Sequence, residues 1–142
     1  MHEISSVAWV YQQDEKILCV KTRGKDKFFI PGGKLNHNES NESALQREIL
    51  EELSVSLSKQ SLKHLVTIKE TAYGLENTLV NMHCFTADYQ GKIHINSEIE
   101  TSMWIGLDNI ALCAPAAQRV LEQVLKKNAL DTSNSDLAAE QP

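Results

Sequence analysis

The chain has 142 residues, of which 42% are hydrophobic and 23% are charged, and its net charge is −5. This length fits one domain with its own core, and the acidic balance excludes a general nucleic-acid-binding surface, which needs a basic field. The sequence shows no secretion signal, no apolar run of membrane-spanning length, and no cysteine spacing typical of a disulfide framework or zinc site, so we expect a cytoplasmic protein without membrane contact.

Short strands are predicted in the first part of the chain. Residues 5–13 and 16–22 alternate in the manner of two strands and predict a hairpin. Residues 28–30 predict a third short strand, which we expect to end at Pro31 because two glycines follow it.

The second half predicts further strands and a closing helix. The strands are expected at residues 63–74, 77–91, 92–96 and 103–105, and an amphipathic helix at residues 115–127. Strands before and after a central helix predict an α/β fold in which a mixed sheet is covered on both faces. We therefore expect one domain at residues 1–127, followed by a polar tail at residues 128–142 that is disordered.

The central helix, residues 45–53, divides sharply into an apolar and a charged side. At about 100° per residue, the charged side consists of Arg47, Glu48, Glu51 and Glu52. The opposite arc of Leu45, Ile49, Leu50 and Leu53 is apolar, and we expect it to be buried in the core. The i, i+3 and i+4 spacing predicts that the three carboxylates converge on one patch. A solvated acidic face is the alternative, because like charges on an exposed helix cost only about 0.2–0.5 kcal/mol per pair.

Two neighbouring features favour a ligand site over a solvated face. Arg47 follows Glu39 by eight residues and precedes Glu51 by four, so it can hold one or both carboxylates in place. Gly32 and Gly33 precede the helix and let the backbone approach a ligand closely.

The same residues carry a family resemblance. Gly33, Glu39, Arg47-Glu48-Ile49, Glu51-Glu52 and Val55 match the pattern G-x5-E-x7-R-E-U-x-E-E-x-G-U, where U is a bulky aliphatic residue. This stretch resembles the Nudix box of the Nudix hydrolases, and residues 28–34 and 98–110 are also similar to that family. Ser54 stands where the family has glycine, which we expect to cost about 1 kcal/mol at a left-handed helix end or to shift the turn.

The resemblance implies a Nudix-type α/β/α sandwich with a metal site on the charged helix. Mg²⁺ is the implied cofactor, with Mn²⁺ as a substitute, and both prefer oxygen ligands. By analogy with the family, Glu48 is the leading general base and Glu52 can share that role, while Arg47 orients the carboxylates with Glu39 in support. The implied metal ligands are Glu48, Glu51, Glu52 and the carbonyl of Gly33.

Candidate substrate contacts outside the box rest on weaker signals. Lys34 follows the glycines and is a candidate phosphate contact, with a solvated lysine as the equal alternative. A candidate basic rim for an anionic substrate consists of Arg23, Lys25 and Lys27, and surface solubility explains these residues at least as well. Phe28, Phe29 and Tyr73 are candidates for stacking on a base, although core packing is the better interpretation for each.

Glu98 and Glu100 precede Trp104 in a stretch that reads as a loop. Members of the family often carry an extra acidic residue there, as a metal ligand or base contact, and ordinary surface is the alternative for both glutamates.

The function that the resemblance implies is cleavage of a diphosphate linkage in a nucleoside diphosphate joined to another group. We expect a (deoxy)nucleoside triphosphate pyrophosphohydrolase of the MutT type, acting on a small nucleotide. The alternatives are a hydrolase of a nucleotide sugar, a dinucleoside polyphosphate or an RNA 5′ end, and a non-catalytic nucleotide-sensing module. The sequence leaves the base, the leaving group and the oligomeric state open, a homodimer included.

Overall fold

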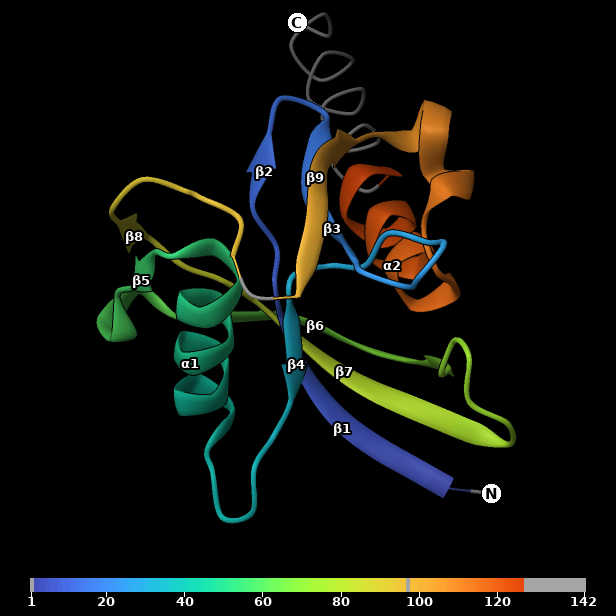
Figure 1. Ribbon diagram of the computed structural model, residues 1–142, viewed down its shortest axis with the longest axis horizontal. Coiled ribbons are helices and arrows are strands. Elements are labelled where there is room, and N and C mark those ends of the chain that lie inside the picture. The colour runs from blue at the N-terminus through green and yellow to red at the C-terminus, as the bar shows by residue number, and fades with distance from the viewer. Residues whose placement is uncertain (1, 97, 127–142) are drawn as a thin grey trace, which may run out of the picture.

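A mixed four-stranded sheet and an antiparallel three-stranded sheet form the middle of the computed structural model, which describes residues 2–96 and 98–126 (Figure 1). Two helices, α1 (Asn41–Leu53) and α2 (Pro115–Leu121), flank the sheets. The strands are β1 (His2–Trp9), β2 (Gln12–Gln13), β3 (Lys16–Thr22), β4 (Gly32–Lys34), β5 (Ser56–Leu57), β6 (Lys63–Thr71), β7 (Thr78–Thr86), β8 (Tyr89–Gln90) and β9 (Ile99–Ile105). Short helical turns lie at Lys59–Ser61 (η1), Leu107–Leu112 (η2) and Glu122–Lys126 (η3).

The four-stranded sheet is mixed, as predicted. Its order is β4-β1-β7-β6, and β1 runs parallel to β7 while the other neighbours are antiparallel. The second sheet has the order β2-β3-β9, and β5 pairs with β8. The predicted α/β class is therefore confirmed.

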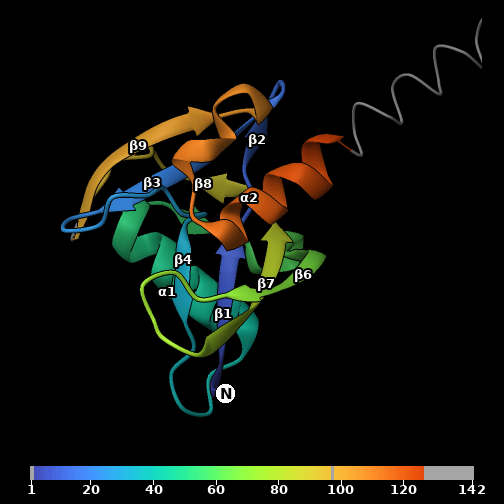
Figure 2. The same cartoon turned by 90° about the vertical axis from the view of Figure 1, so that its right-hand side faces the viewer.

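Alternation along β1 divides the core into two layers. Val7 and Trp9 pack with α1, whereas Ala8 packs with α2 on the other side of the sheet. Figure 2 shows the two helices on opposite sides of β1 and β7. Because successive side chains of a strand face opposite ways, one strand serves both layers.

The glycines after Pro31 form a strand instead of ending one. Phe28 and Phe29 make only isolated bridges, to Cys113 and Val20, so the predicted strand at residues 28–30 is wrong. Strand β4 starts at Gly32, opposite Ala8, and the oxygen of Val7 lies 1.9 Å from where a β-carbon at Gly32 would stand. Gly32 has φ 150°, so this close pairing requires glycine.

Four other strand predictions differ from the structure. The strand predicted at residues 77–91 is divided into β7 and β8, which belong to different sheets. Residues 92–96 form no strand; the amides of His94 and Asn96 donate to the carbonyls of Leu53 and Glu52 in the last turn of α1. The strand predicted at residues 5–13 is interrupted after Trp9, and β9 starts at Ile99 instead of residue 103. In each case long-range pairing overrides the local pattern.

Helix α1 begins and ends with identifiable caps. The Ser40 hydroxyl accepts from the Ser43 amide at 3.1 Å, and Ser54 adopts a left-handed conformation with φ 64° and ψ 21° while its amide donates to Leu50. The helix buries Ala44, Leu45, Ile49 and Leu53, but Leu50 is 53% exposed and its predicted burial is wrong. Serine thus keeps the turn that glycine would make and carries the strain of that conformation.

The part of the chain that the structure describes contains no helix long and apolar enough to cross a bilayer. The predicted helix at residues 115–127 is present as α2 followed by η3, except for its last residue, which lies outside the described residues. The predicted tail at residues 128–142 lies outside them as well.

Candidate functional site

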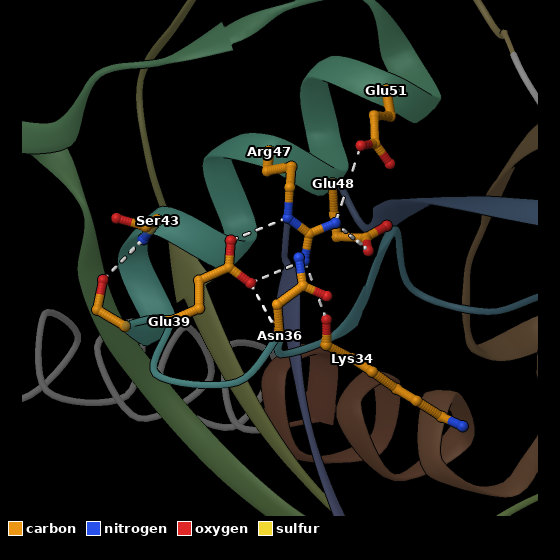
Figure 3. Close-up of polar contacts among 8 residues, drawn as sticks. Lys34, Asn36, Glu39, Ser43, Arg47, Glu48 and Glu51 are labelled. Atoms are coloured by element: carbon orange, nitrogen blue, oxygen red, sulfur yellow. Dashed lines mark hydrogen bonds and ion pairs between the residues drawn. The ribbon is translucent and has the colours of Figure 1, made fainter.

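Arg47 is the centre of a polar network on α1 (Figure 3). Its guanidinium donates to both carboxylate oxygens of Glu39, from Nε and Nη2, at 2.9 Å each. Nη1 donates to Glu48 at 2.8 Å, and Nη2 also donates to the carbonyl of Lys34 at 3.2 Å. The bidentate pair with Glu39 gives the guanidinium a fixed plane, so Glu48 is held by a donor that is itself fixed.

Glu39 supports this arrangement from the loop before α1. The Arg47 guanidinium, with help from the backbone amide of Asn36 at 2.8 Å, lowers the pKa of Glu39 from 4.5 to about 2. Opposite charge and hydrogen bonds both favour the ionised carboxylate. The predicted supporting role of Glu39 thus has a direct geometric counterpart.

Glu48 and Glu52 lie one helical turn apart and interact with each other. Burial, followed by the like charge of Glu48 and a hydrogen bond with it, raises the pKa of Glu52 from 4.5 to about 9. Glu52 is therefore protonated at neutral pH in the metal-free protein and can donate to the Glu48 carboxylate. The backbone amide of Gly32 also donates to Glu52 and partly offsets the rise in its pKa.

Gly33 lies directly against this pair. A β-carbon built at Gly33 would stand 2.5 Å from the carboxyl carbon of Glu48 and 2.7 Å from each of its oxygens. The absence of a side chain at Gly33 therefore makes room for the Glu48 carboxylate, and the predicted proximity of the glycine backbone to the charged helix is present.

Glu51 stands apart from the other two glutamates. Its side chain is 55% exposed and lies 3.8 Å from Nη1 of Arg47. Figure 3 shows it one turn beyond Arg47. Among the residues that the structure describes, no three His, Cys, Asp or Glu side chains are grouped closely enough to hold a metal ion. The structure thus brings Glu48 and Glu52 together, and Glu51 is close to Arg47 instead.

The donor set nevertheless fits a hard divalent cation. Two partly buried carboxylates that share a proton are in an environment where a cation replaces that proton favourably. Carboxylates and backbone carbonyls are the ligands that Mg²⁺ and Mn²⁺ prefer. Glu48, Glu52 and the Gly33 backbone would hold such an ion, with the exposed Glu51 as an outer ligand.

A cavity of about 300 Å³ opens beside this pair, between the mixed sheet and α2. Its lining includes Gly33, Lys34 and Glu52, together with the aromatic residues Phe29 and Tyr73. Most of the remaining lining is apolar, with contributions from β1, β7 and α2 among other elements. The volume lies at the lower end of the range for small-molecule pockets, so the carboxylate pair borders a space suited to a compact ligand.

The substrate contacts predicted outside the box are placed as follows. Lys34 lines the cavity, and Figure 3 shows its side chain pointing away from Arg47. Phe28 packs against the core instead, and its neighbour Phe29 faces the cavity. The two phenylalanines differ because successive residues in extended backbone point to opposite sides.

Arg23, Glu98 and Glu100 lie outside the cavity lining. The amide of Arg23 donates to the carbonyl of Glu98 at 2.9 Å, and both side chains are exposed. Glu100 belongs to β9, not to a loop, and pairs with Lys21 at 3.1 Å. The structure therefore does not bring these three side chains to the carboxylate pair.

Lys25, a predicted member of the basic rim, lines the cavity, whereas sequence reasoning missed Thr22 and Asp26 as neighbours of the site. Thr22 also lines the cavity, and Asp26 accepts a hydrogen bond from the Tyr73 hydroxyl at 2.7 Å. The polar run "GKDK" before Phe28 was the one available signal, and its pairing with a residue 47 positions away could not be read from it.

Comparison with known proteins agrees with the box and the fold. The model of the NUDIX domain matches residues 1–126. No curated protein matches the sequence.

Solved structures with the same fold span several named proteins. The MutT NUDIX hydrolase from Burkholderia pseudomallei is 23% identical, with a TM-score of 0.74 over 87% of this chain and 99% of that one. The E. coli ORF135 protein is 24% identical, with a TM-score of 0.72 over 92% and 94%. The E. coli dihydroneopterin triphosphate pyrophosphohydrolase is 16% identical, with a TM-score of 0.65 over 88% and 95%.

Proposed function

The chain belongs to the Nudix hydrolase family, and from this premise we propose that it is a Mg²⁺-dependent pyrophosphohydrolase of (deoxy)nucleoside triphosphates. The observation that carries the proposal is the cavity of about 300 Å³ that is lined by both Glu52 and Lys34 and by the aromatic residues Phe29 and Tyr73. The lysine and a cation held at the carboxylate pair would suit phosphates, and the aromatic residues suit a planar base, so a single nucleotide matches both the charge and the size of the cavity.

The residues have separable roles in this proposal. Glu48 is the general base that takes a proton from the attacking water, because Arg47 fixes its carboxylate at 2.8 Å. Arg47 and Glu39 are positioning residues, since they act through Glu48. Lys34 balances phosphate charge at the mouth of the cavity.

A divalent cation held by Glu48, Glu52 and the Gly33 carbonyl would neutralise phosphate charge and polarise the phosphoryl oxygen. Glu52 must give up its proton before it can serve as a ligand, because its pKa is raised to about 9 in the metal-free protein. The family resemblance and the donor chemistry support Mg²⁺, and Mn²⁺ is the expected substitute.

A panel assay tests the proposal. Nucleoside triphosphates, a nucleotide sugar, a dinucleoside polyphosphate and a triphosphorylated RNA are incubated with Mg²⁺, and both products of each are identified. We expect a nucleoside monophosphate and pyrophosphate from triphosphates, with loss of turnover in Glu52→Gln. Glu42→Gln is the matched control, since Glu42 lies in the first turn of the same helix, away from the carboxylate pair.

If the protein hydrolyses another class of compound in the panel faster than nucleoside triphosphates, that class replaces the proposed substrate. If no compound is hydrolysed while a nucleotide still raises the melting temperature, the chain is a nucleotide-sensing module. The retained pair of Glu48 and Glu52 argues against a sensor, because an unused site has no physical reason to bury a second carboxyl group beside Glu48 at the cost of keeping it protonated.

A further inference from the structure

Two loops from different sheets meet beside the aromatic residues that line the cavity. Residues 23–27 follow β3 of the antiparallel sheet, and residues 72–77 connect β6 to β7 of the mixed sheet. The Tyr73 hydroxyl donates to Oδ1 of Asp26 at 2.7 Å and joins the two loops. Lys25 extends over the same turn, since its Nζ would lie 3.8 Å from a β-carbon at Gly74.

The Tyr73 ring is part of an aromatic wall. Its centroid lies 6.2 Å from that of Phe29 with an interplanar angle of 58°, and both residues line the cavity. This separation is within the range of interacting aromatic pairs. Tyr73 is half-buried, so part of its ring remains open to a ligand.

Asp26 restricts what the Tyr73 ring can do. A tyrosine in a connecting turn normally samples several rotamers, and the hydrogen bond to Asp26 selects one of them. A ring fixed before the ligand arrives loses less side-chain entropy on binding. The hydroxyl is already engaged, so the part of Tyr73 that is offered to a ligand is its face.

The polar side chains of the cavity read the edge of a base poorly. Ser6, Thr22 and Thr71 line it with hydroxyl groups, each of which rotates to serve as donor or acceptor. Among the described residues that line the cavity, none carries a side-chain amide, whose fixed donor and acceptor would distinguish one base edge from another. Lys25 and Lys34 provide positive charge, which suits phosphates.

We propose that Tyr73, fixed by Asp26, is a specificity-determining residue that selects nucleotides by stacking on the planar base and accepts purines and pyrimidines alike. This inference rests on the proposed function, since it assumes that the ligand of the cavity is a nucleotide. Stacking is tolerant of sequence because every base has a π face.

Calorimetric binding without metal or turnover tests the inference. The ligands are AMP, UMP and ribose 5-phosphate, which share the phosphate and sugar and differ in the base. We expect AMP and UMP to bind within about fivefold of each other, and each about tenfold or more tighter than ribose 5-phosphate, since stacking on one aromatic ring is of that size.

Variants separate the ring from its hydrogen bond. Tyr73→Ala should bring AMP and UMP down to the affinity of ribose 5-phosphate and leave that sugar phosphate unchanged. Tyr73→Phe and Asp26→Ala should each lower the affinity for AMP and UMP about two- to fivefold, and the double variant should lose no more than either, because both remove the same hydrogen bond. Tyr89→Phe is the matched control; it removes a tyrosine hydroxyl that contacts Tyr11 and does not line the cavity.

The inference is overturned if Tyr73→Ala, shown by circular dichroism to be folded, keeps the wild-type preference for nucleotides over ribose 5-phosphate. A preference of more than fiftyfold between AMP and UMP overturns it as well, because edge recognition then dominates. Hydrolysis of nucleoside triphosphates with either result leaves the proposed function standing and removes only the inference. If nucleotides bind in a way that depends on Tyr73 but none is hydrolysed, the inference stands and the proposed function falls.

Discussion

Gly33→Ala isolates the geometry of the Glu48 carboxylate. The new methyl carbon would stand 2.5 Å from the carboxyl carbon of Glu48, whereas carbon atoms in contact are normally about 3.5–4.0 Å apart. The carboxylate therefore has to move by roughly 1 Å, the difference between the two distances. The Glu48 side chain is flexible, so this displacement is expected to move the carboxylate without disrupting the fold.

The expected cost falls mainly on catalysis. A misplacement of about 1 Å in a reacting group lowers the rate by about 10²-fold, or about 2.7 kcal/mol of transition-state stabilisation. Glu48 also gives up its 2.8 Å bond from Arg47, which lowers the free energy of unfolding by about 1.5–3 kcal/mol. We expect kcat to fall by two orders of magnitude in a protein that still unfolds cooperatively.

The assay is the initial rate of pyrophosphate release at saturating Mg²⁺, measured in a double-mutant cycle with Glu48→Ala. If Gly33→Ala acts by displacing the carboxylate, it should change the rate by less than about threefold once Glu48 is absent. A full hundredfold loss in the Glu48→Ala background would refute this reasoning and place the effect in the backbone of Gly33. A single variant with wild-type kcat would refute it too.

Three further predictions concern α1 and its network. Glu52→Gln should lower kcat at least 10²-fold. It should also stabilise the metal-free protein relative to wild type, increasingly between pH 5 and 9, because the pKa of Glu52 is raised from 4.5 to about 9 and its ionisation destabilises the fold as pH rises. Melting temperatures of variant and wild type in EDTA that differ equally at every pH would contradict this prediction. Glu39→Gln should make the free energy of unfolding depend less on pH between pH 5 and 2, because the pKa of Glu39 is lowered to about 2 and the stability that its carboxylate contributes above pH 4.5 is lost as pH falls toward 2. Urea midpoints of variant and wild type that change in parallel from pH 5 to pH 2 would exclude this linkage. Ser54→Gly should raise the free energy of unfolding, measured in urea, by about 1 kcal/mol and leave kcat unchanged, because glycine adopts the left-handed conformation at φ 64° without the strain that serine carries. A destabilised variant would mean that the serine side chain contributes to the cap.

The charged helix could be predicted because its information is local. The spacing of Glu39, Arg47 and Glu48 along one helix and its lead-in places them within reach of one another, and the network around Arg47 has that form. Leu50 shows the limit of the same method. Leu50 lies at the edge of the apolar arc, and its position on the helix does not reveal whether a neighbouring element covers it. In the structure no element covers Leu50 fully.

The substrate end could not be predicted because it depends on contacts between distant segments. Phe28 and Phe29 are indistinguishable in sequence, and pairing with Val20 and Cys113 decides which of them faces the cavity. Tyr73 meets Asp26 only because the β6–β7 turn and the loop after β3 come together in three dimensions. No local periodicity encodes such a meeting.

The attachment of residues 92–96 to α1 gives the site built-in spectroscopic probes. The amide hydrogens of His94 and Asn96 are bonded to the carbonyls of Leu53 and Glu52, at 2.9 and 3.0 Å. Their nitrogen and proton chemical shifts therefore respond to small movements of the helix end that carries Glu52. A titration with cation or nucleotide followed by two-dimensional NMR can thus report from two peaks, with no label placed in the site itself.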